Sequence, residues 1–323
     1  MNRNNKTSSI TEAAMITGIL VIMAFLSSFI FIITFFYPIP AIILAKRKGI
    51  RYAALSLLAA DVIITILLGL TTGVMFLILY TPFALALAYG IYRDEEANKT
   101  ILYGAAAYMT SFVVLILLMS KLMGINFVEQ LKSANSESYG MIEQMLSNAP
   151  SAMDPEKVDE TLKMLGDYVK TTDFILSNLF PALIIMTSVM AAYINYVIAR
   201  KFAGRFSIII KKPERLSHFS FPKTFMAAMA ALLLISYLFG ALKFNVRVIQ
   251  LNLFYIVFIA MILQGVAVIK FFMEKRQTIK AFQILIFVMI FYMSAFFAGL
   301  TQIIAIIGLI DLAIDLRKIN KAV

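Results

Sequence analysis

The sequence predicts an all-α, polytopic helical membrane protein, because apolar residues dominate the chain and occur in long uninterrupted segments. Hydrophobic residues make up 61% of the 323 positions and charged residues only 15%, whereas ordinary globular chains carry about 25% charged residues. A transmembrane helix needs about 20 consecutive apolar residues. The apolar runs, separated by short charged clusters, predict about eight to ten hydrophobic segments, of which about eight are full spans and two are short.

The first segments follow a polar, basic tail at 1–12. Within this tail, Ser9 and Glu12 have the Ser-x-x-Glu spacing of a capping box, which predicts that a helix starts there. The next 33 residues carry no charge, and this stretch is too long for one span and too short for two. We therefore expect a full span at 13–33 and a short, proline-led helix at 37–46.

Further apolar segments complete the predicted set of spans. Thr71, Thr72 and Gly73 are expected to form a tight turn between two of them. The expected spans lie at 52–70, 73–91, 101–120, 177–199, 224–242, 250–271 and 281–298, with a shorter segment at 301–316.

The stretch 121–176 differs from the rest because it is acidic and amphipathic. It contains nine acidic and five basic residues, and apolar residues recur at i, i+4, i+7 and i+11 from Val158, which is the spacing of one helical face. Asp154 and Pro155 have the residue types of a helix N-cap and first helical position. We therefore predict two amphipathic helices, the first of them broken near Gly140.

The formal net charge of +11 is distributed unevenly between the apolar segments. Basic residues gather near 46–51, 200–223 and 272–280, and the positive-inside rule places such segments in the cytoplasm. This arrangement puts 121–176 outside and the N-terminus inside, and it places the 92–100 loop inside as well. We expect a multi-pass protein of the bacterial cytoplasmic (inner) membrane, with the lipid bilayer as its first partner.

The predicted organisation follows from the points at which the charge pattern changes. The parts are a cytoplasmic tail (1–12), a membrane unit (13–200) with the extracellular helical loop 121–176, a basic cytoplasmic loop (201–223), C-terminal membrane helices (224–316) and a basic tail (317–323).

Residue content excludes several kinds of chemistry. The chain has no cysteine and a single histidine, His218, so thiolate catalysis, cysteine-based metal sites and multi-histidine sites are excluded. Neither a Walker-type loop nor a GxGxxG motif occurs, so ATP hydrolysis would need a separate protein. We expect no enzyme activity, no cofactor and no metal site. The positive charge is explained by membrane orientation, so we expect no nucleic-acid partner.

Asp61 is the most informative single residue, because it lies at the midpoint of the 52–70 span. A carboxylate at that depth costs about 2.5–3.5 kcal/mol and must face protein or water. Thr65 lies four residues later on the same helical face. Two interpretations stay open. In the first, Asp61 and Thr65 bind a ligand, cation or proton. In the second, Asp61 makes an interhelical hydrogen bond.

Other polar residues within the predicted spans favour structural roles. Asp311, Asp315 and Asn195 are expected to make hydrogen bonds or ion pairs between helices or near the interface, and Asp315 has the i, i+3 spacing for a pair with Lys318. Uncharged residues expected to act in the same way are Asn252, Gln264 and Gln302.

Two stretches resemble known families. The segment PIPAIILAKRKGIRYAALSLLAADVI (38–63), preceded by a helix with the small residues Ala14 and Gly18, resembles the opening of the S components of energy-coupling-factor vitamin transporters. The segment GLIDLAIDLRKI (308–319), together with the acidic loop 121–176, is similar to the YybS-like bacterial membrane proteins, which are grouped distantly with the S-component superfamily.

The resemblance implies a six-helix, S-component-like unit at about 13–200. In S components, small residues on the first helix contact a membrane coupling subunit, and Ala14 and Gly18 are the matching positions here. It also implies an ATPase partner and a small-molecule ligand bound from the outer side. The expected function is non-enzymatic binding of a small solute or lipid as a transporter-like subunit. The alternative is a membrane scaffold or regulatory protein in envelope assembly.

Overall fold

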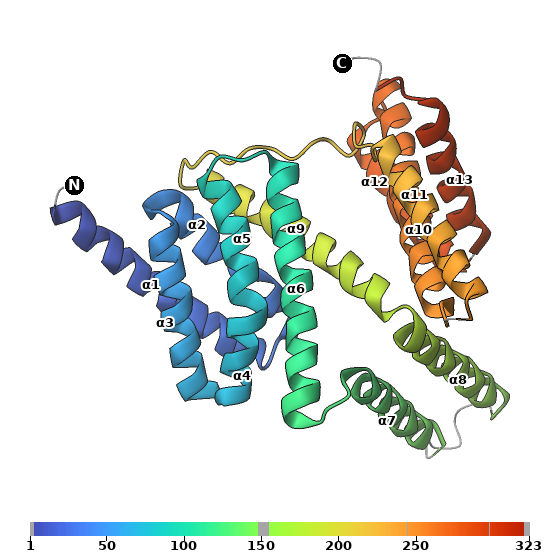
Figure 1. Ribbon diagram of the computed structural model, residues 1–323, viewed down its shortest axis with the longest axis horizontal. Coiled ribbons are helices and arrows are strands. Elements are labelled where there is room, and N and C mark those ends of the chain that lie inside the picture. Colours follow the sequence, from blue (N-terminus) through green and yellow to red (C-terminus); the bar gives the residue numbers. More distant parts are fainter. Residues whose placement is uncertain (1–2, 148–154, 244, 297, 320–323) are drawn as a thin grey trace. The chain divides into compact units, whose positions relative to one another are not determined.

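The computed structural model describes residues 3–147, 155–243, 245–296 and 298–319, and every regular element within these ranges is a helix (Figure 1). The chain divides into two compact units, Met1–Pro213 and Glu214–Val323. The division falls inside the predicted basic loop 201–223. The all-α class predicted from the sequence is therefore confirmed.

Unit 1 is built on a layer of apolar helices and carries a projecting helical hairpin. The short helix α2 packs against α3, α5 and α9, while α1 packs against α3, and α6 packs against both α5 and α9. Figure 1 shows the hairpin of α7 and α8 between the ends of α6 and α9. The elements are α1 (Arg3–Ser27), η1 (Phe31–Phe36), α2 (Pro38–Lys48), α3 (Ile50–Leu68), α4 (Leu70–Met75), η2 (Phe76–Tyr80), α5 (Thr81–Tyr92), α6 (Ala97–Met123), α7 (Phe127–Ser147), α8 (Pro155–Asn178) and α9 (Phe180–Gly204).

Unit 2 contains α10 (Lys223–Ala241), α11 (Arg247–Lys275), α12 (Lys280–Phe296) and α13 (Ala298–Ile314). Its closest helix pair is α11 and α13. A Cβ atom added at Gly265 would lie 2.0 Å from the Ile304 carbonyl oxygen, and one added at Gly308 would lie 2.0 Å from the Met261 carbonyl oxygen. The two backbones therefore touch, as small residues allow between membrane helices.

Seven helices among the described residues are long and apolar enough to cross a membrane. They are Thr7–Ser27, Ile50–Leu68, Leu70–Tyr92, Ala97–Lys121, Phe180–Gly204, Thr224–Ala241 and Arg247–Lys275, and Gly299–Ile314 is a shorter apolar helix. Helix α2 has 11 residues and is about 16 Å long, roughly half of the hydrocarbon thickness. The chain is thus a polytopic helical membrane protein.

Three local predictions were wrong. Helix α1 already includes Arg3, so Ser9 and Glu12 lie inside the helix, and the Glu12 carboxylate pairs with Arg47 instead of capping a helix.

The other two corrections concern glycines. The break between α3 and α4 occurs at Gly69, whose φ is 92°, and Thr71–Gly73 continue into helix α4. Helix α7 runs through Gly140 without interruption, since one glycine in an exposed helix costs only about 1 kcal/mol relative to alanine.

Candidate functional site

One end of unit 1 gathers basic residues from several segments. The Glu12 carboxylate of α1 lies 2.9 Å from the Arg47 guanidinium and 3.4 Å from the Lys48 ammonium of α2. The loop after α5 joins the same end, because the Lys46 ammonium donates to the Asp94 carboxylate and the Lys211 ammonium donates to the Asp94 carbonyl oxygen. These contacts explain how the acidic 92–100 loop and the basic segments lie at one end of the unit.

Asp94 lies outside the membrane-spanning segments, and its electrostatics follow from these contacts. The hydrogen bond from Lys46 holds the pKa of this exposed carboxyl below its ordinary value, and the charge of Lys211 acts in the same direction. The Asp94 carboxylate therefore stays ionised and paired with Lys46 of α2 at physiological pH, while the Asp94 carbonyl oxygen accepts from Lys211 after α9.

A groove of about 760 Å³ lies between α1, α2 and α9. We call it the α1–α2–α9 groove. Most of its wall is apolar, with a polar edge formed by four charged side chains. The lining residues are Glu12, Ile16, Ile19, Met23, Phe36, Ile39, Pro40, Ile43, Leu44, Arg47, Ile198, Lys201, Phe202, Arg205 and Phe206.

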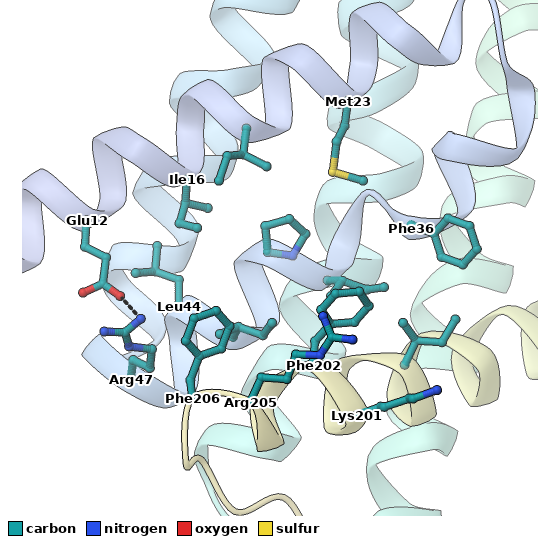
Figure 2. A pocket seen from close by; sticks show the side chains of 15 residues that line it. Glu12, Ile16, Met23, Phe36, Leu44, Arg47, Lys201, Phe202, Arg205 and Phe206 are labelled. Carbon is teal, nitrogen blue, oxygen red and sulfur yellow. Dashed lines mark ion pairs between the residues drawn. The ribbon is translucent and has the colours of Figure 1, made fainter.

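The charged side chains are spread along the groove, with Arg205 and Lys201 on the α9 side (Figure 2). Figure 2 shows the Glu12–Arg47 ion pair at one end and Met23 and Phe36 toward the other. The Arg47 guanidinium also lies 5.7 Å from the centre of the Phe206 ring. The groove therefore suits a molecule with a charged head and an apolar body.

The sequence did not predict this groove. Lys201 and Arg205 contributed only to the positive-inside argument, and the groove is lined by helices that are far apart in the sequence. The available signal was the alternation of cations and aromatic residues in Lys201–Phe206, which favours an interface between lipid and water.

The Asp61 carboxylate on α3 is buried and hydrogen-bonded to other elements of unit 1. It accepts a 2.7 Å hydrogen bond from the Thr81 hydroxyl of α5, and the Tyr37 hydroxyl lies 3.5 Å from its other oxygen. The Tyr37 ring packs edge-on against Phe76, with ring centres 4.8 Å apart. Phe76 begins the π-helical stretch η2, a distortion that is frequent at functional sites. The Thr81–Asp61 contact is the kind of interhelical hydrogen bond that was the second interpretation of Asp61.

Thr65 does not share this arrangement. Its hydroxyl donates to the Asp61 backbone carbonyl oxygen at 2.7 Å, and α4 packs closely on it at Gly73, where a Cβ would lie 1.8 Å from that hydroxyl oxygen. The structure brings Thr81 and Tyr37, rather than Thr65, to the carboxylate. Their separations of 20 and 24 residues from Asp61 gave no spacing signal.

Ala14 and Gly18 lie on an exposed face of α1, and no described atom comes within 4 Å of a Cβ built on Gly18. Another face of α1, which includes Ala13 and Thr17, is buried, and there the Thr17 hydroxyl donates to the Ser56 carbonyl oxygen of α3 at 3.2 Å. The predicted partner-contact residues are therefore accessible on this unit.

Asn195 on α9 is buried, and its amide donates to the Phe35 carbonyl oxygen at 2.8 Å and to the Ala191 carbonyl oxygen at 3.0 Å. The first bond joins α9 to η1, so Asn195 connects two elements that are distant in the sequence.

A second polar cluster lies in unit 2 around Asp311. The Arg317 guanidinium lies 2.8 Å from the Asp311 carboxylate, and the two side chains are 1% and 2% exposed. The Gln264 amide of α11 donates to the same carboxylate at 2.7 Å, and Arg317 also donates to the Ser217 carbonyl oxygen at 2.8 Å. Asp315 follows the end of α13, and its carboxylate accepts a 3.0 Å hydrogen bond from the Ile319 N–H.

The comparisons with known proteins agree with this architecture. Residues 15–312, which include most of both units, match the family described as "Predicted membrane protein (DUF2232)". The chain belongs to this family.

One relative in this comparison is "Uncharacterized protein YybS" of Bacillus subtilis (strain 168), which is 23% identical over 320 residues that cover 97% of this chain and 98% of the relative. The resemblance to YybS-like membrane proteins is therefore confirmed over nearly the whole chain. No solved structure matches the chain, so the likeness to S components stays a prediction.

Proposed function

We propose that this DUF2232 member is a non-enzymatic, transporter-like subunit of the bacterial cytoplasmic membrane that binds a small amphiphilic solute or a lipid. The α1–α2–α9 groove is the observation that carries the proposal. Its volume of about 760 Å³ is within the range of about 300–1,000 Å³ that is typical of small-molecule sites. Its apolar wall is complementary to the hydrocarbon part of an amphiphile, and its charged edge is complementary to a polar head.

The proposed topology places the basic end of unit 1 in the cytoplasm. Arg47, Lys48 and Lys211 lie at that end, and the positive-inside rule favours their retention there. The groove then opens toward the inner leaflet, on the side opposite to that expected from S components. Ala14 and Gly18 provide a face for a coupling subunit, and an ATPase partner would supply the energy.

The test is to purify the protein in mild detergent and to detect bound small molecules by native mass spectrometry. Ile43→Trp places a larger side chain in the groove from a half-buried position. Ile66→Trp is the matched control, since Ile66 is 76% exposed on α3 and does not line the groove.

We expect bound amphiphiles on the wild type and on Ile66→Trp, and their loss from Ile43→Trp. Equal retention by both variants would overturn the proposal.

A scaffold role in envelope assembly is the second candidate. It is supported by the α7–α8 hairpin, on which Met145 and Met164 are 75% and 67% exposed. Such apolar side chains outside the bilayer favour a protein contact. Met145→Gln combined with Met164→Gln should then impair envelope assembly and leave the molecules bound in the groove unchanged, whereas the transporter-like role predicts that assembly is unaffected.

A further inference from the structure

The edge of the α1–α2–α9 groove carries more positive than negative charge. Three cationic side chains and one carboxylate line the groove. That carboxylate, Glu12, is already engaged by Arg47 at 2.9 Å and by Lys48 at 3.4 Å. The remaining cations of the lining, Lys201 and Arg205, therefore lack charge compensation from it.

Lys201 and Arg205 are neighbours at the C-terminal end of α9. Lys201 lies in the last turn of α9 and Arg205 directly follows the helix, four residues later, and both are exposed. Neither forms an ion pair with a carboxylate in the part of the chain that the structure describes. The Arg205 guanidinium lies 5.3 Å from the centre of the Phe202 ring, a contact that leaves its N–H groups able to donate.

The groove is about as long as one leaflet is deep. Along α1 the lining runs from Glu12 to Met23, which is about 16 Å at 1.5 Å per residue. Half of a hydrocarbon core of about 30 Å is about 15 Å. The groove is therefore long enough to hold one acyl chain along α1.

We infer that the occupant is an anionic glycerophospholipid of the leaflet at the basic end, held with its phosphate between Lys201 and Arg205 and one acyl chain along Ile16, Ile43 and Met23. This inference rests on the proposed function and names its ligand class. Guanidinium and ammonium groups are the side chains that best bind phosphate. The inner leaflet is rich in anionic lipid. A wholly polar solute is disfavoured because the deeper lining offers it apolar side chains alone.

The test uses the full chain in nanodiscs that contain equal amounts of phosphatidylglycerol and phosphatidylcholine with identical acyl chains. Native mass spectrometry after gentle release measures the ratio of the two lipids retained on the protein. The variant is Lys201→Gln combined with Arg205→Gln. Its matched control is Arg51→Gln combined with Lys212→Gln, which removes the same charge from exposed residues outside the groove lining.

We expect the wild type and the control to retain phosphatidylglycerol in preference to phosphatidylcholine. The Lys201/Arg205 variant should lose about 25-fold of that preference, since each of the two groove cations contributes about a fivefold effect. Lys201→Arg should keep the preference. A preference that is the same in the Lys201/Arg205 variant and in the control would overturn the inference.

Ile43→Trp separates this outcome from failure of the proposed function. If it removes both lipids while the charge variants leave their ratio unchanged, the groove binds lipid without headgroup selection and only the inference falls. If it removes neither lipid, the proposed function and the inference fall together.

Discussion

The Thr81 hydroxyl of α5 donates a 2.7 Å hydrogen bond to the Asp61 carboxylate of α3, and both side chains are buried. The bond joins two helices of the apolar core of unit 1. Because each partner satisfies the other, the loss of either leaves a buried polar group unpaired.

The first prediction concerns this pair. Asp61→Ala and Thr81→Val should each lower the free energy of unfolding by about 1–3 kcal/mol, and the double variant should lose less than the sum. Asp61→Asn should remain close to wild type in stability, since the amide oxygen still accepts from Thr81. Thermal unfolding in detergent of all four variants measures the coupling.

Strictly additive losses would contradict the structural role of the pair. Asp61→Asn also distinguishes a ligand or proton role, because that role predicts loss of function at normal protein abundance.

The second prediction concerns the crossing of α11 and α13. Gly308→Ala places a Cβ 2.0 Å from the Met261 carbonyl oxygen, so the helices must separate. We expect a loss of about 1–3 kcal/mol, as for other overpacked sites. Protease resistance of unit 2 is the measurement. Gly299→Ala is the matched control on α13, where no described atom lies within 4 Å of the added Cβ, and it should be resistant; equal sensitivity of the two variants would refute the close approach.

The third prediction concerns the ion pair in unit 2. Arg317→Ala leaves the Asp311 carboxylate buried without its cation, which costs about 3–5 kcal/mol. Replacement of both residues by leucine should cost less, because no unpaired charge remains. Denaturation of unit 2 monitored by circular dichroism gives the comparison, and a double variant less stable than Arg317→Ala would show that the pair itself adds stability.

The fourth prediction concerns pH. The Asp94 pKa is lower in the folded protein than in the unfolded chain, mainly through the hydrogen bond from Lys46. Its stabilising effect is therefore present above the unfolded carboxyl pKa of about 3.9 and is lost as the pH falls through the folded value. The Tm difference between the wild type and Asp94→Asn should be positive at neutral pH and should shrink only in stronger acid. Asp159→Asn, an exposed carboxyl change on α8, should show a smaller difference at neutral pH.

The fifth prediction concerns the exposed face of α1. Leucine at both Ala14 and Gly18 should leave Tm unchanged, because both positions are exposed, and should reduce copurification of a coupling subunit and its ATPase in mild detergent. Ile66→Leu on α3 is the control. Unchanged recovery of partners would exclude this face as the contact.

The spans could be predicted from the sequence because length and hydropathy alone decide membrane insertion. The spans at 52–70 and 177–199 correspond to α3 and α9 within a few residues. Helix ends were less predictable. The Glu12 carboxylate could either cap a helix or form an ion pair, and it pairs with Arg47.

The candidate site could be predicted less completely than the fold. Asp61 stood out because charge is costly in a membrane, but its partners Thr81 and Tyr37 come from other helices and share no periodicity with it. The α1–α2–α9 groove depends on how three helices pack, and no local pattern encodes the space between them.

The Gln264–Asp311 hydrogen bond joins residues that are 47 positions apart, and this separation sets an order of events during synthesis. Helix α11 emerges from the ribosome before α12 and α13, so Asp311 reaches the bilayer only after Gln264 is already there. The backbone contact between Gly265 and α13 forms at the same late step. Unit 2 therefore closes when α13 arrives, and a nascent chain stalled before that helix would present an unfinished surface to membrane quality control.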